Sequence, residues 1–127
     1  MAVKTVKEYG HQAFRLLQIV FVVAPIVAGL DKFFYILANW SVYISPFALS
    51  TIHFHDRGFM MIVGIVEIIV GIMNIFKPRV FAYITAIWLA LIIINLLMIG
   101  RYYDIALRDF GLFLSAIAFG RLSQKYA

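Results

Sequence analysis

The sequence contains no cysteine, and this absence excludes several kinds of site at once. Disulfides, thiolate nucleophiles, iron–sulfur clusters and cysteine-ligated zinc all require that side chain. Charged residues are also scarce, at 13% of the chain against about 25% in an ordinary soluble domain. Hydrophobic residues make up 65% of the 127 residues. The composition therefore predicts a membrane protein with one transmembrane domain, residues 1–127, and no separate soluble domain.

Four apolar stretches approach the length of about 20 residues that a helix needs to cross the hydrocarbon core. The predicted helices span about residues 12–37, 58–76, 80–100 and 105–122, and the segment 39–56 is expected at headgroup depth on the outer face. The last helix includes Arg108 and Asp109, so a half-span or an interfacial helix is the alternative there. A cleaved signal peptide is the alternative for the first stretch, but Ile26 and Ala28 make a poor cleavage site. The prediction is an all-α, membrane-embedded, antiparallel four-helix bundle.

The distribution of basic residues predicts the orientation of this bundle. Four crossings would place the termini and the turn at residues 77–79 on one side, which then receives most of the lysine and arginine residues. Because cytoplasmic loops carry the Lys/Arg excess, both termini are expected in the cytoplasm. The net charge of +5 then reflects topology and attraction to anionic lipid. No nucleic-acid partner is expected, because the sequence has no basic groove with interleaved aromatic residues.

Glu67 is the one carboxylate inside an apolar run, in the stretch GIVEIIVGIMN of residues 64–74. It lies about 13 Å into its predicted helix, at a rise of about 1.5 Å per residue, which is near the middle of a membrane. An acid at that depth is expected to face the protein interior and to find a partner. Lys32 or Arg108 is the predicted partner, with Asn95 bridging. A functional role for Glu67 and a purely structural ion pair both stay open.

Other charges are expected to join Glu67 between the helices. Acids of the outer side often have a basic neighbour in sequence, as in Arg108–Asp109, but adjacent residues on a helix point about 100° apart. Their partners are therefore expected from other helices. In the third helix, Thr85, Trp88, Ile92 and Asn95 share one face by their spacing. The predicted intramembrane polar cluster consists of Glu67, Arg108, Lys32, Asn95, Asp109 and Asp31.

Small residues at helical spacing are expected to let the helices approach closely, because lipid provides no hydrophobic force between them. The candidates for helix packing are Gly29, Gly64, Gly71 and Gly111. Pro25 cannot donate a backbone hydrogen bond and is expected to kink the first helix.

The sequence offers little for catalysis or cofactor binding. His53, His55 and Asp56 in the outer connection form one weak candidate for a metal site, and a polar loop is the favoured interpretation. No histidine lies mid-span on facing helices, so no haem is expected. No nucleophile with an adjacent base and no phosphate-binding loop is recognisable. A non-catalytic subunit is therefore favoured over an independent enzyme.

Three motifs, in this order, resemble the DoxX family of small four-helix membrane proteins. They are Arg15 followed by GLDK at 29–32, GIVEIIVG at 64–71 and RDFGLFLSAIAF at 108–119, and the resemblance covers about residues 12–122. It implies a multi-pass protein of the bacterial or archaeal cytoplasmic (inner) membrane, surrounded by the lipid bilayer and by other membrane or periplasmic subunits.

The function implied by this resemblance is that of an accessory subunit of a membrane-bound oxidoreductase complex. Some relatives form the small membrane subunit of a thiosulfate:quinone oxidoreductase, so a quinone is one open ligand and a lipid is another. Two alternatives come from the residues themselves. One is a small proton-coupled transporter that uses Glu67, and the other is a structural membrane assembly factor.

Overall fold

The computed structural model describes residues 5–51 and 56–127, and this part of the chain is helical with no strand. Its elements are α1 (Val6–Phe34), the 3-10 helix η1 (Trp40–Tyr43), α2 (Pro46–Thr51), α3 (Asp56–Phe76), α4 (Pro78–Ile99) and α5 (Tyr103–Tyr126). The all-α prediction is confirmed. Within the described ranges, α1, α3 and α4 are long and apolar enough to cross a membrane. α5 has 24 residues but is too polar to be counted with them.

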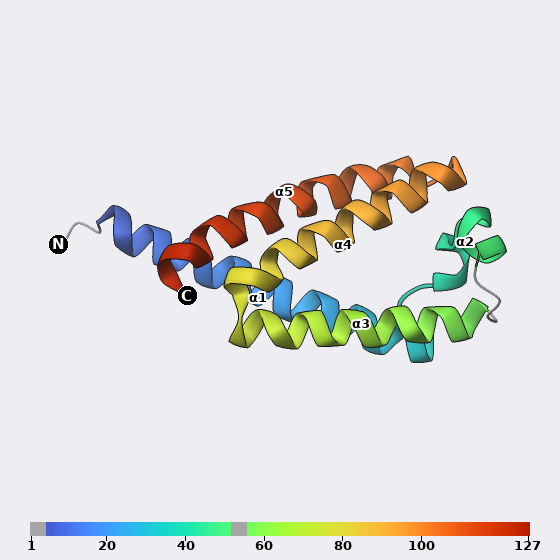
Figure 1. The fold of residues 1–127 in the computed structure, drawn as a ribbon, viewed down its shortest axis with the longest axis horizontal. Helices are drawn as coiled ribbons and strands as arrows, with labels where there is room; N and C mark the ends of the chain where they lie inside the picture. Colours follow the sequence, from blue (N-terminus) through green and yellow to red (C-terminus); the bar gives the residue numbers. More distant parts are fainter. Residues whose placement is uncertain (1–4, 52–55) are drawn as a thin grey trace.

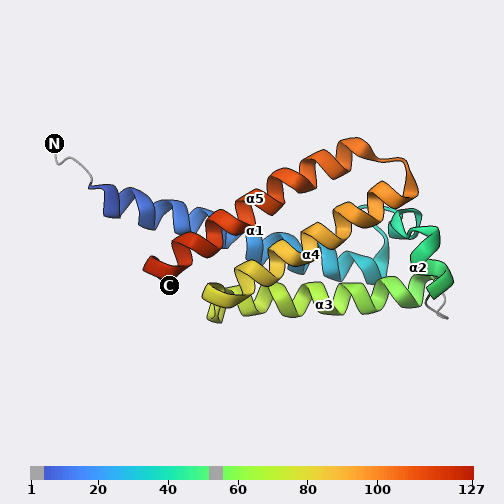
Figure 2. The ribbon, with the colours of Figure 1, turned by 45° about the horizontal axis from the view of Figure 1, so that its top comes forward.

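The long helices pack as two pairs. α1 lies against α3, and α4 lies against α5, whereas the contacts between the pairs are fewer. Figures 1 and 2 both show the pairs meeting near the start of α4 and diverging toward the end that carries η1 and α2. We call the first the closed end and the second the open end. The divergence leaves space between the pairs at the open end.

Aromatic rings and alanines fill the core of the closed end. The ring of Phe119 stacks on Phe14 and on Phe21, each with 5.7 Å between ring centroids. Asn74 is fully buried beside them and joins three helices, because its side-chain nitrogen donates to the carbonyl of Phe21 at 3.1 Å and to the hydroxyl of Thr85 at 3.0 Å. The buried core cluster comprises Phe14, Phe21, Ala82, Ala86, Ala116 and Phe119.

The ends of α1 differ from the predicted range of 12–37. The helix begins earlier, at Val6, because the Thr5 side chain accepts a hydrogen bond from the backbone N–H of Glu8 at 3.2 Å and caps it. It ends earlier, at Phe34, because Tyr35 adopts a left-handed conformation with φ of 55°. The predicted helix 58–76 begins two residues late and ends as observed, and the other two differ from the observed helices by one to four residues at their ends. Segment 39–56 holds η1 and α2, and its depth in a membrane stays a prediction.

Two glycines allow α1 and α3 to touch. A Cβ atom added at Gly29 would lie 2.6 Å from the carbonyl oxygen of Gly64, and one added at Gly64 would lie 2.5 Å from that of Gly29. Any larger side chain would push the backbones apart. A Cβ at Gly71 would lie 2.7 Å from the Ile26 side chain, so this glycine also faces α1. The helix α1 continues through Pro25.

The prediction that Gly111 packs against another helix is wrong. Gly111 is exposed, and a Cβ added there would meet nothing within 4 Å. The spacing of small residues selected a face of α5 that points away from the protein. α5 instead buries a neighbouring face, formed by Ala106, Asp109, Ala116, Phe119, Gly120 and Ser123.

Candidate functional site

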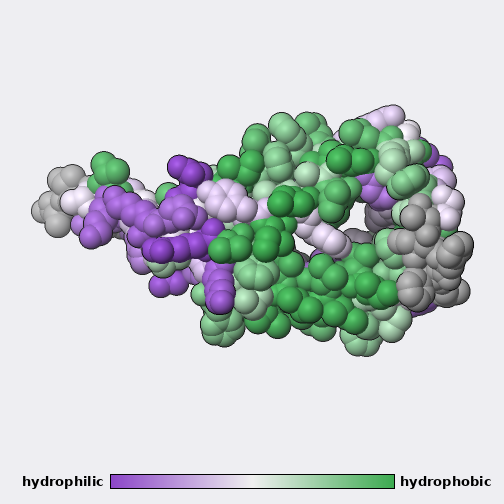
Figure 3. All heavy atoms as spheres, viewed as in Figure 1, coloured by the Kyte–Doolittle hydropathy of each residue, from purple (hydrophilic) through white to green (hydrophobic). Residues whose placement is uncertain are grey.

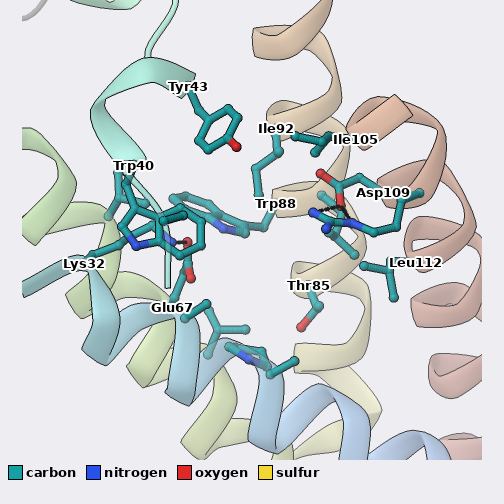
Figure 4. A pocket seen from close by; sticks show the side chains of 18 of the residues that line it. Lys32, Trp40, Tyr43, Glu67, Thr85, Trp88, Ile92, Ile105, Asp109 and Leu112 are labelled. Carbon is teal, nitrogen blue, oxygen red and sulfur yellow. Dashed lines mark hydrogen bonds and ion pairs between the residues drawn. The ribbon is translucent and has the colours of Figure 1, made fainter. Parts of the chain in front are cut away.

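A cavity of about 600 Å³ lies between the two helix pairs. Helices α1, α3, α4 and α5 and the segment with η1 all contribute to its wall (Figure 4). In the space-filling view, the surface is hollowed at this place between the pairs (Figure 3). The volume falls in the range of about 300–1,000 Å³ that is usual for small-molecule pockets. The lining is mostly apolar, and its polar groups form a small set.

Lys32 of α1 and Glu67 of α3 form a buried ion pair in the cavity wall. Lys32 Nζ lies 2.8 Å from Glu67 Oε1, and the two side chains are 6% and 8% exposed. Each residue follows its helix's contact glycine, Gly29 or Gly64, by three positions. Because α1 and α3 run in opposite directions (Figure 1), Lys32 and Glu67 lie on opposite sides of this crossing, and their long side chains meet across it. Of the two predicted partners for Glu67, the structure pairs it with Lys32.

Trp40 of η1 covers the Lys32 ammonium. Lys32 Nζ lies 3.8 Å from the centroid of the Trp40 ring, at a distance suited to a cation–π interaction. The indole N–H of Trp40 donates to Asp31 Oδ2 at 2.8 Å. Asp31 also accepts the backbone N–H groups of Ile36 at 3.0 Å and Leu37 at 2.9 Å. Asp31 thus holds the loop after α1, and its link to the ion pair runs through Trp40.

Asp109 of α5 lies across the cavity from the ion pair (Figure 4), and its neighbour Arg108 also lines the cavity. Arg108 Nε is 3.4 Å from Asp109 Oδ1; the Asp109 side chain is 7% exposed and that of Arg108 is 68% exposed. The expectation that these charges pair with other helices is wrong, because the long arginine side chain bends back to its neighbour in sequence. Arg108 is consequently not the ion-pair partner of Glu67.

Asn95 does not bridge the charged residues, contrary to the prediction. Its side-chain nitrogen donates to the carbonyl of Tyr43, and its side-chain oxygen accepts the backbone N–H of Ser45 at 3.0 Å. A primary amide offers a donor and an acceptor together, so it can pair with exposed backbone as another backbone segment would. Asn95 therefore fastens the end of η1 to α4 beside the cavity.

The two tryptophans were not among the predicted site residues, yet both line the cavity. Trp40 was assigned to the membrane interface, and no periodicity links it to Asp31 across the loop. The signal for Trp88 was present, because Thr85, Trp88, Ile92 and Asn95 share a face of α4 and all four line the cavity. The indole nitrogen of Trp88 is buried and has no hydrogen-bond partner within residues 5–51 and 56–127.

The candidate metal site falls partly outside the described residues. His53 and His55 are not described, so the prediction on His53, His55 and Asp56 stays a prediction. In the described part of the chain, no group of three or more histidine, aspartate or glutamate side chains could hold a metal ion.

The comparisons with known proteins add no relative. No protein-family model, no curated protein and no solved structure matches the chain. The resemblance to the DoxX family thus stays a prediction from three sequence motifs. The cavity remains the feature from which a function can be inferred.

Proposed function

We propose that this chain is an integral membrane protein that crosses the bilayer four times and binds an uncharged amphiphile between its helix pairs. Large apolar side chains on all four long helices of the described chain are exposed, including Leu16, Ile69, Leu91 and Leu107, as expected for surfaces that face lipid. α5 supports the fourth crossing, because it lies along α4 and is of similar length. In this arrangement the four helices form an antiparallel bundle.

The positions of the basic residues support a cytoplasmic location of both termini. The start of α1, the turn between α3 and α4, and the end of α5 all lie at the closed end (Figure 1). Basic residues of these segments are Lys7, Arg15, Lys77, Arg79, Arg121 and Lys125. Since cytoplasmic surfaces carry the Lys/Arg excess, the closed end faces the cytoplasm and the cavity lies toward the other side.

The chemistry of the cavity supports a ligand with an apolar body and a small uncharged polar group. Its four charges form two pairs, Lys32 with Glu67 and Arg108 with Asp109, so the site has no net charge that would select an ion. Figure 3 views the molecule across the long helices, and the hollow faces sideways, where the bilayer would lie. A ligand dissolved in the membrane would therefore enter without crossing water.

The observation that carries this proposal is that a buried ion pair borders a cavity of about 600 Å³. A pair that served packing alone would be enclosed by side chains, because an unfilled volume forfeits contacts. Together with the resemblance to the DoxX family, this supports an accessory subunit of a membrane-bound oxidoreductase complex in a bacterial or archaeal cytoplasmic membrane. A quinone is a ligand of the proposed class, and the complex would supply the larger membrane or periplasmic partner.

The two tryptophans make a direct test of ligand binding. The chain has no others, both line the cavity, and a quinone quenches the fluorescence of an indole it contacts. Titration of the protein in lipid nanodiscs with decylubiquinone should give saturable quenching. Ala28→Phe, which narrows the cavity, should abolish the saturable part, whereas Val27→Phe on the exposed neighbouring position should keep it. Quenching that rises linearly in both variants would show partitioning into the bilayer and reject the proposal.

A small proton-coupled transporter is the second candidate, favoured by the placement of Glu67 at the cavity. Transport would require Glu67 to leave Lys32 and to exchange protons with both sides of the membrane. Protein in liposomes should then move protons down an imposed pH gradient, and Glu67→Gln should stop the flux while the helix content is retained. An equal flux with Glu67→Gln excludes this candidate.

A further inference from the structure

We infer that the bound amphiphile is a lipid alcohol, whose hydroxyl group lies between the Trp88 indole N–H and the Glu67 carboxylate. This inference rests on the ligand binding proposed above and names the chemistry of the ligand's polar group. It follows from one unused donor and one neighbouring acceptor in the cavity wall.

The unused donor is the indole N–H of Trp88. The nitrogen is buried and lacks a hydrogen-bond partner in the described part of the chain, although buried polar groups are nearly always bonded. Trp40 provides a contrast within the same cavity, because its N–H donates to Asp31 at 2.8 Å. Only one of the two indoles therefore has a donor left for a ligand.

The neighbouring acceptor is the carboxylate of Glu67. Figure 4 shows Glu67 and Trp88 together at the cavity wall. Both residues line the same cavity, and the indole nitrogen has no hydrogen-bond partner in the described part of the chain. The ion pair with Lys32 is made through Oε1, so the second carboxylate oxygen is the acceptor offered to a ligand.

A group that fits between these two must accept from the indole and donate to the carboxylate. A hydroxyl does both, whereas a ketone, an ester or an ether can only accept. A carboxylate on the ligand would be repelled by Glu67 and by nearby Asp109, and an ammonium group would compete with Lys32 for Glu67. The ligand's polar group is accordingly an uncharged hydroxyl.

The rest of the cavity wall indicates what carries this hydroxyl. Apolar side chains of four helices continue from Trp88 around the space, among them Phe21, Val70, Leu89 and Leu112. They suit a hydrocarbon body, as in a long-chain alcohol, a sterol-like alcohol or a quinone in its reduced dihydroxy form. A water molecule could make the same two hydrogen bonds, but it would confer no preference among amphiphiles.

Equilibrium binding of tritiated 1-dodecanol tests the inference. The protein in nanodiscs, corrected with empty nanodiscs, is competed with unlabelled 1-dodecanol, with its methyl ether and with dodecanoate. The alcohol should compete roughly three- to tenfold better than the ether, which cannot donate to Glu67, and the carboxylate should compete least. Equal competition by alcohol and ether, or stronger competition by dodecanoate, overturns the inference. No saturable binding by any of these amphiphiles would instead count against the proposed function.

Trp88→Phe tests the donor separately. It should weaken the alcohol roughly three- to tenfold, because the ring is kept and the N–H is lost. Trp40→Phe is the comparison variant: its indole N–H is already bonded to Asp31 and is not offered to the ligand, so it should weaken the alcohol less than Trp88→Phe does. If Trp88→Phe leaves alcohol binding unchanged, the N–H is occupied by water or by Glu67 and the inference is wrong. The ratio measured with the unmodified protein does not depend on either variant folding.

Discussion

The closed end and the open end both bury polar side chains, but of different kinds. At the closed end the groups are neutral and bond mainly to backbone, as Asn74 does to Phe21, and among the described residues only the Asn74 side-chain oxygen lacks a partner there. At the open end they include charged groups that border a cavity, as Lys32 and Glu67 do. Hydrogen bonds from neutral side chains to backbone fix how the helices pack, whereas an ion pair beside a cavity leaves polar atoms that can bind a ligand. The two ends should therefore respond differently to mutation.

Lys32→Met should have the largest effect, because it leaves the buried Glu67 without a cation. The free energy of unfolding in detergent should fall by about 3–5 kcal/mol, measured by denaturation with increasing sodium dodecyl sulfate. The double variant Lys32→Met, Glu67→Met should recover most of this loss while losing ligand binding. If the double variant is as unstable as the single one, the pair contributes something other than charge compensation.

Gly29→Ala should come next, because the new Cβ would lie 2.6 Å from the Gly64 carbonyl oxygen and force α1 and α3 apart. Overpacking of this kind costs about 1–3 kcal/mol of unfolding free energy. Gly111→Ala is the matched control, since nothing lies within 4 Å of the added atom. It should be neutral or stabilising by up to about 1 kcal/mol, because alanine favours helix over glycine. Equal destabilisation by both would mean that α1 and α3 do not cross so closely.

Asn74→Leu separates the two ends most directly. It removes the hydrogen bonds to Phe21 and Thr85 at the closed end, which should cost about 1–3 kcal/mol of unfolding free energy. Decylubiquinone quenching of the folded variant should stay as in the unmodified protein. Loss of saturable quenching in Asn74→Leu would show that the ends are coupled and that the comparison between them fails.

Asn95→Leu should have the smallest effect. It removes the side chain that bonds to Tyr43 and Ser45, so the unfolding free energy should fall by about 1 kcal/mol. The loss should appear locally, as faster hydrogen exchange at the Ser45 amide. Uniformly faster exchange along α4 would place the role of Asn95 in the helix pair rather than in η1.

Parts of the site that depend on one helix could be predicted from the sequence. Spacing along a helix determines which residues share a face. It therefore predicted that Gly29 and Gly64 lie at helix contacts, and that one face of α4 carries Thr85, Trp88, Ile92 and Asn95. The depth of Glu67 in its helix likewise limited the candidates for its ion-pair partner to Lys32 and Arg108.

Contacts made by loops, and contacts for which helical spacing allows more than one partner or face, could not be predicted. Asp31 accepts hydrogen bonds from backbone N–H groups of the loop that follows α1, and α1 ends where Tyr35 adopts a left-handed conformation. No periodicity in the sequence predicts the path of that loop. Asn95 bonds to backbone groups near η1 and not to the charged residues, and helical spacing alone does not distinguish these two kinds of partner. In α5, small residues lie on two neighbouring faces, so their spacing could not tell which face packs, and Gly111 was assigned to the wrong one.

The contact between Gly29 and Gly64 also limits how the protein can move. With two backbones in direct contact, α1 and α3 cannot slide or separate without breaking this crossing. α4 and α5 are joined to each other more extensively than to the first pair. Entry and release of a ligand would then require a hinge motion, in which α4 and α5 move together as one rigid pair about the stacked rings of Phe21 and Phe119.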